Sequence, residues 1–264
     1  MKLATWNVNG IRARQAQLFD WLAVEKPDIV CLQEIKASHD QLTFELRDME
    51  GYWSYWHGDK GYSGVALLVS KALVGAMPIC SHPGFDFEQR IACGTITLPG
   101  PAPIGDVMVA SVYVPNGGKD FDAKMRFLHA LESYVAEAVR DGKLLIVCGD
   151  LNVALEERDI HPKLRKPGLI GATPEERALL ARIISLGLVD VHRKFEGEND
   201  NLFTWWAPWR QSKERNIGWR IDYVLASRAL ADRATSAAVQ REIGSSDHGP
   251  VVVQFELERR TPDL

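Results

Sequence analysis

Acidic, amide, phenolic and imidazole side chains interrupt or end several apolar runs of this sequence. They are Asn7, Asn9, Glu34, Tyr113, Asn116, Asp150, Asn152, Asp222, Asp247 and His248. Carboxylate and amide oxygens are the ligands that Mg²⁺ and Mn²⁺ prefer, whereas zinc sites are usually built from clustered cysteines and histidines. A hard cation of this kind suits phosphate, so the set predicts phosphate chemistry at a site with a divalent ion.

Taken singly, each of these residues also has a simpler interpretation. The asparagines and aspartates could be turn or capping residues, and Tyr113 could be a packed strand aromatic. Glu34 could form a surface ion pair with Lys36. Asp222 is less easily explained this way, because an acid inside an apolar strand pattern needs a charged or hydrogen-bonded partner if it is buried. A buried histidine would satisfy it, and we expect His248 to lie within hydrogen-bonding distance.

The elements that would position these side chains are mixed strands and helices. Capping signals at Thr173 and Glu176 predict a helix that runs to Leu186, and apolar periodicity predicts further helices over 122–140 and 14–25. The class is therefore α/β. Buried strands are expected at 3–8, 28–33, 64–70, 91–98, 107–114, 144–150, 221–227 and 251–257.

Two segments of the sequence show a short similarity to one another. Two Ile-Val-Cys runs lead to polar residues, to Glu34 in one case and to Asp150 and Asn152 in the other. Two such halves would each deliver polar groups from the end of a strand into a shared crevice. This arrangement predicts a site between two packed sheets.

Length and composition set broader bounds. A chain of 264 residues with 46% hydrophobic content is expected to form one domain over 1–264, and no export signal or membrane-spanning run is recognisable. The four cysteines have no CxxC spacing, which favours reduced core thiols and a cytoplasmic location. The net charge of −4 argues against a protein that coats polyanions generally, although a local basic face would suffice for nucleic acid.

Two segments could supply that basic face, 161–166 and 209–220. The second carries Arg210, Lys213, Arg215 and Arg220, and Trp205, Trp206, Trp209 and Trp219 accompany these charges. Arginines interleaved with aromatic rings can hold phosphates and stack on sugars or bases. Solvated loops and core tryptophans are the alternative interpretation.

The motifs TWNVNGIR, LQEIK, GYSGVALLVS, VYVPNGG, GDLNV, GWRIDYVLAS and SDHGPV follow one another between Thr5 and Phe255. In this order they resemble the exonuclease III family of apurinic/apyrimidinic endonucleases, within the endonuclease/exonuclease/phosphatase superfamily. GDLN and SDH are shared with phosphoinositide phosphatases, sphingomyelinases and deoxyribonuclease I. QEIK, GYSGVALL and GWRIDYVLAS point to the DNA-repair branch.

This resemblance implies a four-layer α/β sandwich, in which two mixed sheets pack face to face and are flanked by helices. It also implies a metal-dependent DNA phosphodiesterase that uses Mg²⁺, with Mn²⁺ as the alternative ion. The expected substrates are double-stranded DNA with abasic sites, cut on the 5′ side, and blocked or normal 3′ ends, and the expected state is a monomer without membrane contact. The alternatives are a phosphoesterase for a lipid or another non-DNA phosphoester, and a non-catalytic module that binds damaged DNA.

The resemblance also assigns roles within the set. The catalytic residues would be Tyr113, Asp150, Asn152, Asp222 and His248. The metal would be held by Asn7, Glu34 and Asp247, with Asn9, Asp150 and Asn152 nearby. Asn9 stands where many family members carry an acid. Either Asp150 or His248 would take the proton, with Asp222 fixing the imidazole tautomer.

Substrate recognition would involve a second group of residues. By resemblance, Trp205, Trp219 and Ile221 form the walls of a slot for a flipped-out sugar without its base. Lys36 and Arg220 are expected to contact the DNA. The segment 159–172 follows its family counterpart only in outline, which leaves the balance between internal incision and 3′-end trimming open.

Overall fold

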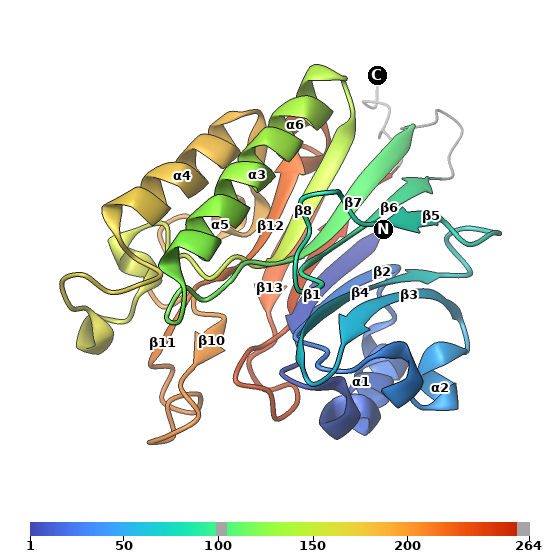
Figure 1. Ribbon diagram of the computed structural model, residues 1–264, viewed down its shortest axis with the longest axis horizontal. Coiled ribbons are helices and arrows are strands. Elements are labelled where there is room, and N and C mark those ends of the chain that lie inside the picture. Colours follow the sequence, from blue (N-terminus) through green and yellow to red (C-terminus); the bar gives the residue numbers. More distant parts are fainter. Residues whose placement is uncertain (99–104, 258–264) are drawn as a thin grey trace, which may run out of the picture.

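Two six-stranded sheets form the centre of the molecule, which is described here by a computed structural model for residues 1–98 and 105–257 (Figure 1). In spatial order, the first sheet contains β13 (Ala234–Val239), β14 (Val251–Phe255), β1 (Lys2–Asn7), β2 (Ile29–Gln33), β4 (Tyr62–Ser70) and β3 (Tyr52–Asp59). The second contains β5 (Ile79–Ser81), β6 (Ile91–Thr97), β7 (Asp106–Tyr113), β8 (Leu144–Asp150), β12 (Asp222–Ser227) and β9 (Leu188–Asp190). A separate pair is formed by β10 (Trp205–Trp206) and β11 (Gly218–Trp219).

Both sheets are mixed. Strands β1 and β2 are parallel, as are β7 and β8, and the other neighbours within the two sheets are antiparallel. The first sheet draws its strands from both ends of the described chain, and the second draws its strands from the middle. The C-terminal strand β14 lies beside the N-terminal strand β1, with Thr5 opposite Val251.

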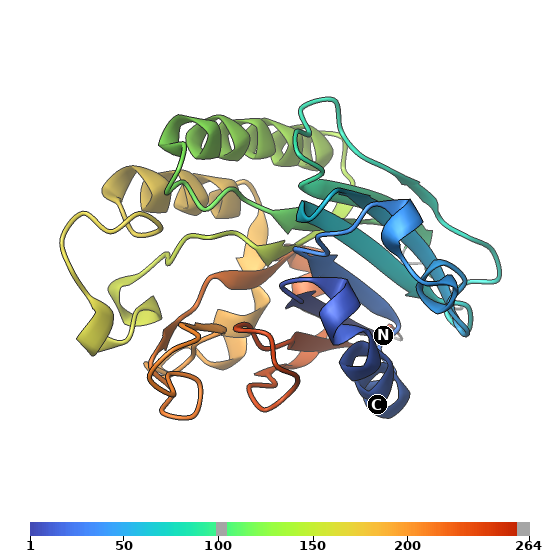
Figure 2. The ribbon, with the colours of Figure 1, turned by 60° about the horizontal axis from the view of Figure 1, so that its bottom comes forward.

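Helices cover the outer faces of the two sheets, as Figure 2 shows. Helices α3 and α4 pack on the second sheet, and α1 packs on the first. These layers confirm the predicted four-layer α/β sandwich. The helices are α1 (Ile11–Glu25), α2 (Phe44–Arg47), α3 (Phe121–Arg140), α4 (Pro174–Ser185), α5 (Val191–Phe195) and α6 (Arg228–Ala231), with 3₁₀ turns η1 (His39–Gln41), η2 (Glu157–Asp159) and η3 (Pro162–Leu164).

The central strands are buried on both faces, and alternation along each strand decides which core a side chain enters. In β1, Leu3 packs between the two sheets, whereas Ala4 packs toward α1. In β8, Ile146 and Cys148 likewise belong to the core between the sheets. Because side chains two residues apart share a face, the residues that end these strands on the same face also point into the space between the sheets.

The predicted capping signal at the start of α4 is confirmed. The hydroxyl of Thr173 accepts the backbone N–H of Glu176 at 3.3 Å, and the Glu176 carboxylate accepts the N–H of Thr173 at 3.0 Å. The helices expected over 122–140 and 14–25 correspond to α3 and α1, with α1 beginning three residues earlier than predicted.

Strand β3 was not predicted, because its sequence, YWSYWHGD, lacks the alternation between apolar and polar residues that marks one buried face. Its first seven residues are accordingly all partly buried. Strand β13 was also missed, because its residues are mostly alanine, serine and threonine. The expectation of one domain over 1–264 stays a prediction, since 99–104 and 258–264 lie outside the described residues.

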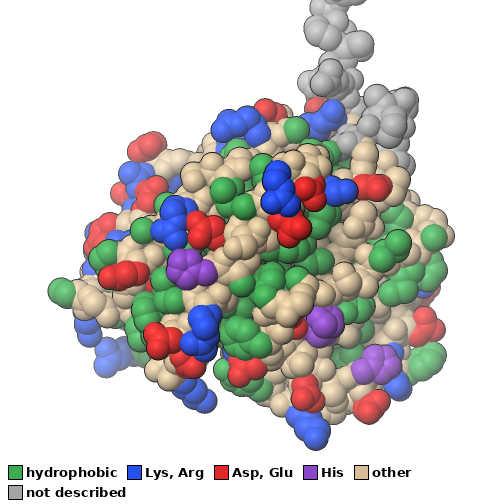
Figure 3. Space-filling view, turned by 45° about the horizontal axis from the view of Figure 1, so that its top comes forward, with side chains coloured by type: hydrophobic (Ala, Val, Ile, Leu, Met, Phe, Trp, Pro, Cys, Tyr) green, Lys and Arg blue, Asp and Glu red, His purple; other side chains and the backbone are tan. Residues whose placement is uncertain are grey.

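On the face drawn in Figure 3, Lys and Arg side chains are interspersed with Asp and Glu side chains. This mixture agrees with the small net charge of −4. The four cysteines carry free thiols, and three of them are buried. Among the described residues, no helix combines the length and apolar character needed to cross a bilayer.

Candidate active site

Asn7 links the two sheets at the carboxyl end of β1. It shares a strand face with Leu3 and Thr5 and therefore points toward the second sheet. Its amide Nδ2 donates to Oε1 of Glu34 and to Oδ2 of Asp150, both at 2.9 Å. Glu34 follows β2 in the first sheet, and Asp150 ends β8 in the second. One amide group thus holds two carboxylates that come from different sheets.

The backbone turns sharply at Glu34, Lys36 and Asn9, all of which have φ between 46° and 51°. These turns bring the Lys36 ammonium to 2.6 Å from both Oε2 of Glu34 and Oδ1 of Asn9. The local Glu34–Lys36 ion pair therefore forms, and it lies partly buried within the site. Burial opposes ionisation of Glu34, but the hydrogen bonds from Asn7 and Lys36 outweigh it and lower the Glu34 pKa.

Asp150 and Asn152 form a tight turn after β8, where Asn152 has φ of 51°. The backbone N–H of Asn152 donates to Oδ1 of Asp150 at 3.0 Å, and its amide Nδ2 donates to Oδ2 at 3.2 Å. Nδ2 also donates to the carbonyl of Val114 at 2.9 Å. Burial raises the Asp150 pKa to about 8, although the nearby His248 acts in the opposite direction. Asp150 is therefore a fixed carboxyl group that holds a proton more readily than an exposed aspartate.

His248 lies between two carboxylates. Asp222 stands opposite Asp150 in the antiparallel pair of β12 and β8, and its Oδ2 is 2.9 Å from Nδ1 of His248. The other ring nitrogen, Nε2, is 3.8 Å from Oδ2 of Asp150. Desolvation alone would lower the His248 pKa, but Asp222 and then Asp150 outweigh it and raise the pKa to about 10. The predicted hydrogen bond between His248 and Asp222 is present.

Asp247 connects this cluster to the tryptophan-rich segment. Its Oδ1 accepts the Asn9 amide at 2.8 Å, and its Oδ2 accepts the indole N–H of Trp205 at 2.9 Å. Burial opposes ionisation, but His248, Trp205 and Asn9 together lower the Asp247 pKa. The carboxylate is therefore ionised and held at both oxygens.

Donor atoms of Glu34, Asp150 and His248 all lie within 4.8 Å of one another. Two carboxylates, one of them ionised at neutral pH, and neighbouring amides fit a hard divalent cation. Asn7 and Asp247 lie beside this trio but use their polar atoms in hydrogen bonds, so their predicted role as direct ligands stays a prediction. The family-implied metal therefore fits the side chains that are present.

A cavity of about 460 Å³ brings the acidic cluster together with an apolar wall. Trp205 and Trp219 meet edge to face with ring centroids 6.4 Å apart, and Ile221 lies beside them. Tyr113 also lines this cavity, and burial together with the charges of Glu34 and Asp150 raises its pKa. The full lining is Glu34, Tyr113, Asn116, Asp150, Asn152, Leu169, Ile170, Gly171, Trp205, Trp219, Ile221, Asp247 and His248.

Sequence reasoning missed part of this lining. Leu169, Ile170 and Gly171 come from the loop before α4, where an apolar pair beside glycines gives no chemical signal. Lys124 was also missed. It is fully buried in an ion pair with Glu176, and its ammonium donates to the carbonyl of Asn152 at 2.7 Å. The sequence signal for Lys124 was the position of a lysine among the regularly spaced apolar residues of the predicted helix over 122–140.

The prediction that Arg220 contacts DNA is wrong. Its side chain is fully buried, with Nε 2.7 Å from Asp159 and Nη1 2.7 Å from Asp190. The guanidinium also lies 4.4 Å from the centroid of the Tyr223 ring. All of these contacts are internal, because a buried acid in η2 and a partly buried acid at the end of β9 demand a cation. Arg220 therefore supports strand β11, which ends at Trp219.

With this fold and this site, the chain can be compared with known proteins. The sequence pattern of the Endonuclease/Exonuclease/phosphatase family matches residues 4–248. The exodeoxyribonuclease of Bacillus subtilis (strain 168) is 35% identical over 257 residues, which cover 95% of this chain and 98% of that protein. The chain belongs to the endonuclease/exonuclease/phosphatase family, and the resemblance to its exonuclease III members is confirmed.

Solved structures give the same result. An AP endonuclease from Archaeoglobus fulgidus is 29% identical, with a TM-score of 0.83, and the match covers 97% of this chain and 100% of that one. A 3′-5′ exonuclease (NExo) from Neisseria meningitidis is 29% identical, with a TM-score of 0.85 and the same coverage. Another structure of Neisseria NExo, called a 3′ phosphatase and bound to product DNA hairpin, is 28% identical with a TM-score of 0.84, covering 97% of this chain and 99% of that one.

Proposed function

We propose that this chain is a divalent-metal-dependent DNA repair nuclease that incises DNA 5′ to abasic sites and trims 3′ ends. The observation that carries this proposal is the shared cavity, which places Glu34, Asp150 and His248 against the wall of Trp205, Trp219 and Ile221. Relatives described as an exodeoxyribonuclease, an AP endonuclease and a 3′ phosphatase support the same activities.

The residues divide the hydrolysis of a phosphodiester among them. Glu34 and Asp150 would hold the cation, which screens the phosphate and stabilises the departing 3′ oxygen when bound. Asp150 also orients the attacking water, and the amide of Asn152 fixes Asp150. Nε2 of His248 donates to a phosphoryl oxygen, because Asp222 holds the imidazole as a protonated donor through Nδ1. Tyr113 supplies a further phosphate contact from the end of β7.

The apolar wall provides the selection for damaged DNA. Two perpendicular indoles and Ile221 leave a slot in which a sugar without a base can pack, whereas an intact nucleotide adds bulk. The hydrogen bond from Trp205 to Asp247 ties this wall to the charged cluster. Recognition of the sugar and positioning of its phosphate are therefore coupled within one cavity.

The proposal includes the metal, the partner and the setting. Mg²⁺ is the preferred ion and Mn²⁺ a substitute, since the donors are mainly hard oxygens. The partner is double-stranded DNA with an abasic site or a blocked 3′ end. A monomer suffices, because one chain supplies every residue that lines the cavity. Buried free thiols support a cytoplasmic location.

One gel tests the function. A duplex oligonucleotide with a central abasic analogue is incubated with the protein and Mg²⁺, with EDTA, and with the Asp150→Ala variant. We expect a cut 5′ to the analogue only in the first reaction. Lack of cleavage in all three reactions would refute the proposal, and tight binding without cleavage would identify a binding module. A 3′-phosphate duplex run in parallel measures the balance between incision and trimming.

A further inference from the structure

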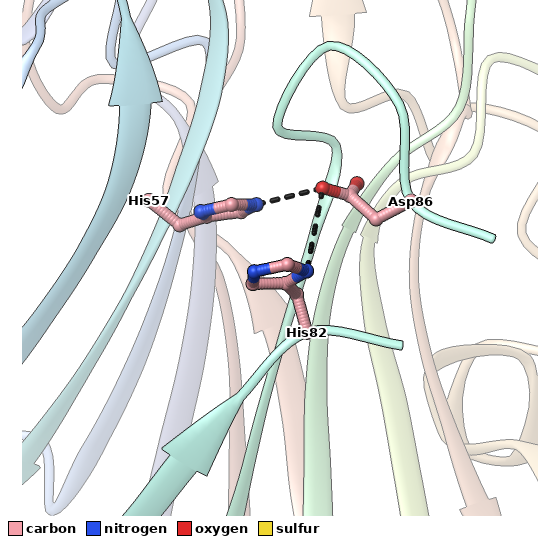
Figure 4. Close-up of side chains that lie close together, drawn as sticks. All are labelled: His57, His82 and Asp86. Carbon is pink, nitrogen blue, oxygen red and sulfur yellow. Dashed lines mark hydrogen bonds and ion pairs between the residues drawn. The ribbon is translucent and has the colours of Figure 1, made fainter. Parts of the chain in front are cut away.

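A second cluster of metal-binding side chains lies apart from the cavity residues. His57 projects from β3, His82 follows β5, and Asp86 lies in the loop before β6. Their donor atoms all fall within 4.8 Å of one another, and Figure 4 shows the three side chains converging from separate segments. Among the described residues, this is the one other group of three with such spacing besides Glu34, Asp150 and His248.

The carboxylate of Asp86 is held so that one oxygen faces the imidazoles. Its Oδ1 accepts the backbone N–H groups of Arg90 at 2.8 Å and Ile91 at 3.1 Å. Its Oδ2 is 2.7 Å from Nε2 of His57 and 4.0 Å from Nδ1 of His82. Outer hydrogen bonds of this type are what orient a metal-binding carboxylate.

A single hydrogen bond between His57 and Asp86 does not account for the arrangement of the two imidazoles. Their rings stack with centroids 4.3 Å apart and an interplanar angle of 10°, and each turns a nitrogen toward Oδ2 of Asp86. The His57–Asp86 hydrogen bond does not need His82, and at 4.0 Å His82 gains little from the carboxylate directly. A cation shared by all three donors explains why both nitrogens face the same oxygen.

We propose that His57, His82 and Asp86 form a binding site for a divalent transition-metal ion, with Zn²⁺ as the matching ion. Two imidazole nitrogens and one carboxylate oxygen are a ligand set that suits zinc and not Mg²⁺, which prefers oxygen ligands. The side chain of His82 is 49% exposed, so solvent reaches the cluster and water completes the coordination. Nε2 of His57 and Oδ2 of Asp86 are 2.7 Å apart without the ion. Zinc bonds of about 2.0–2.2 Å in tetrahedral geometry would move these two atoms to a separation of about 3.4 Å.

This site would be chemically distinct from the active site. A cation in the cavity would be held mainly by oxygens, whereas the second cluster offers two nitrogens. The two are connected through Arg90, whose N–H binds Asp86 and whose guanidinium lies 4.8 Å from the centroid of the Tyr113 ring. Zn²⁺ at the second cluster would thus join β3 to the loop that carries Arg90.

The test is Zn²⁺ binding to the whole protein, stripped with EDTA and then held in excess Mg²⁺. Bound Zn²⁺ is counted for the wild type, for His82→Ala, for His57→Gln and for the control His129→Ala, whose histidine is exposed on α3. His82→Ala removes a half-exposed side chain and should leave the fold intact, which circular dichroism checks. Any Zn²⁺ that enters the active site is common to all four proteins.

We expect the wild type and His129→Ala to bind one more Zn²⁺ per chain than His82→Ala and His57→Gln. In the wild type, Zn²⁺ should also shift the imidazole NMR signals of His57 and His82 together. Equal Zn²⁺ binding by all four proteins, or an equal loss in His129→Ala, would overturn the proposal. Unshifted signals of His57 and His82 at saturating Zn²⁺ would overturn it as well.

Discussion

Oδ2 of Asp222 lies 2.9 Å from Nδ1 of His248, and both side chains are buried at the edge where the two sheets meet. The contact joins β12 of the second sheet to the segment before β14 of the first. It directs Nε2 of His248 toward Asp150 and into the cavity. The state and direction of the imidazole therefore depend on Asp222.

Replacing Asp222 by asparagine should lower kcat by about 10²- to 10⁴-fold, the usual contribution of a positioned proton donor. The amide removes the charge that keeps the imidazole protonated, so the His248 pKa should fall and activity should decline at a lower pH than in the wild type. Steady-state cleavage of an abasic duplex across pH measures both effects. The exposed Asp232→Asn variant is the control, and an unchanged pH profile in Asp222→Asn would contradict this role.

The stability of the metal-free protein should depend on pH through His248. Its pKa is about 10 in the folded protein, against about 6.5 for an unperturbed histidine. A raised pKa means that the folded state binds the proton more tightly, so this stabilisation is complete below about pH 6.5 and is lost as the pH rises through about 10. Urea unfolding in EDTA should show that the free energy of unfolding falls over this pH range, and the fall should be smaller in Asp222→Asn. An equally small pH dependence in the wild type and in the variant would contradict this role of His248.

Asn7→Ala should weaken the divalent-metal site without removing a carboxylate. The amide of Asn7 orients both Glu34 and Asp150, and loss of such an outer partner typically costs about 10–100-fold in metal affinity. The Mg²⁺ concentration for half-maximal cleavage should rise accordingly. An exposed residue, Asn201, provides the matched alanine control, and equal Mg²⁺ dependence in both variants would exclude this role for Asn7.

Trp219→Ala should reduce selection for the abasic sugar. Loss of one aromatic wall is expected to cost about 1–3 kcal/mol, or about 5- to 150-fold in kcat/KM for abasic incision. Trp209 is a suitable control because it is 62% exposed and lies outside the cavity lining. The comparison is made by cleavage kinetics on abasic and intact duplexes. A similar loss in Trp209→Ala would place recognition elsewhere.

Arg220→Met should destabilise the protein without changing its contacts with DNA. The substitution removes the buried cation that pairs with Asp159 and Asp190. This loss should lower the free energy of unfolding by about 3–5 kcal/mol. Urea unfolding measures this change. The salt dependence of DNA binding by the folded variant should match that of the wild type. A smaller slope of log affinity against log salt concentration in the variant would show that Arg220 contacts a phosphate.

The site could be predicted from sequence where strand alternation and chemistry agree. Asp150 ends β8 and Asp222 begins β12, and each lies two residues from an inward-facing residue of its strand, so their direction was implicit in the apolar pattern. His248 could be paired with Asp222 because a buried acid needs a partner. The motifs then fixed the order in which these groups meet.

The remaining features depend on contacts that local sequence does not encode. Arg220 lies within a basic, tryptophan-rich segment, yet Asp159 and Asp190 are distant in sequence and draw it into the interior. Leu169 and Ile170 reach the cavity only because their loop folds across it before α4. The half-buried strand β3 depends on pairing with β4 and not on its own pattern.

The bridge from Asn7 to Glu34 and Asp150 makes the proposed active site dependent on complete folding. Neither sheet alone carries the complete set of reactive groups. The first sheet also needs strands from both ends of the described chain. A polypeptide in which the two sheets have not docked therefore holds Glu34 and Asp150 apart from one another and lacks the assembled site. In the proposed nuclease, cleavage of DNA therefore requires that the two sheets are docked.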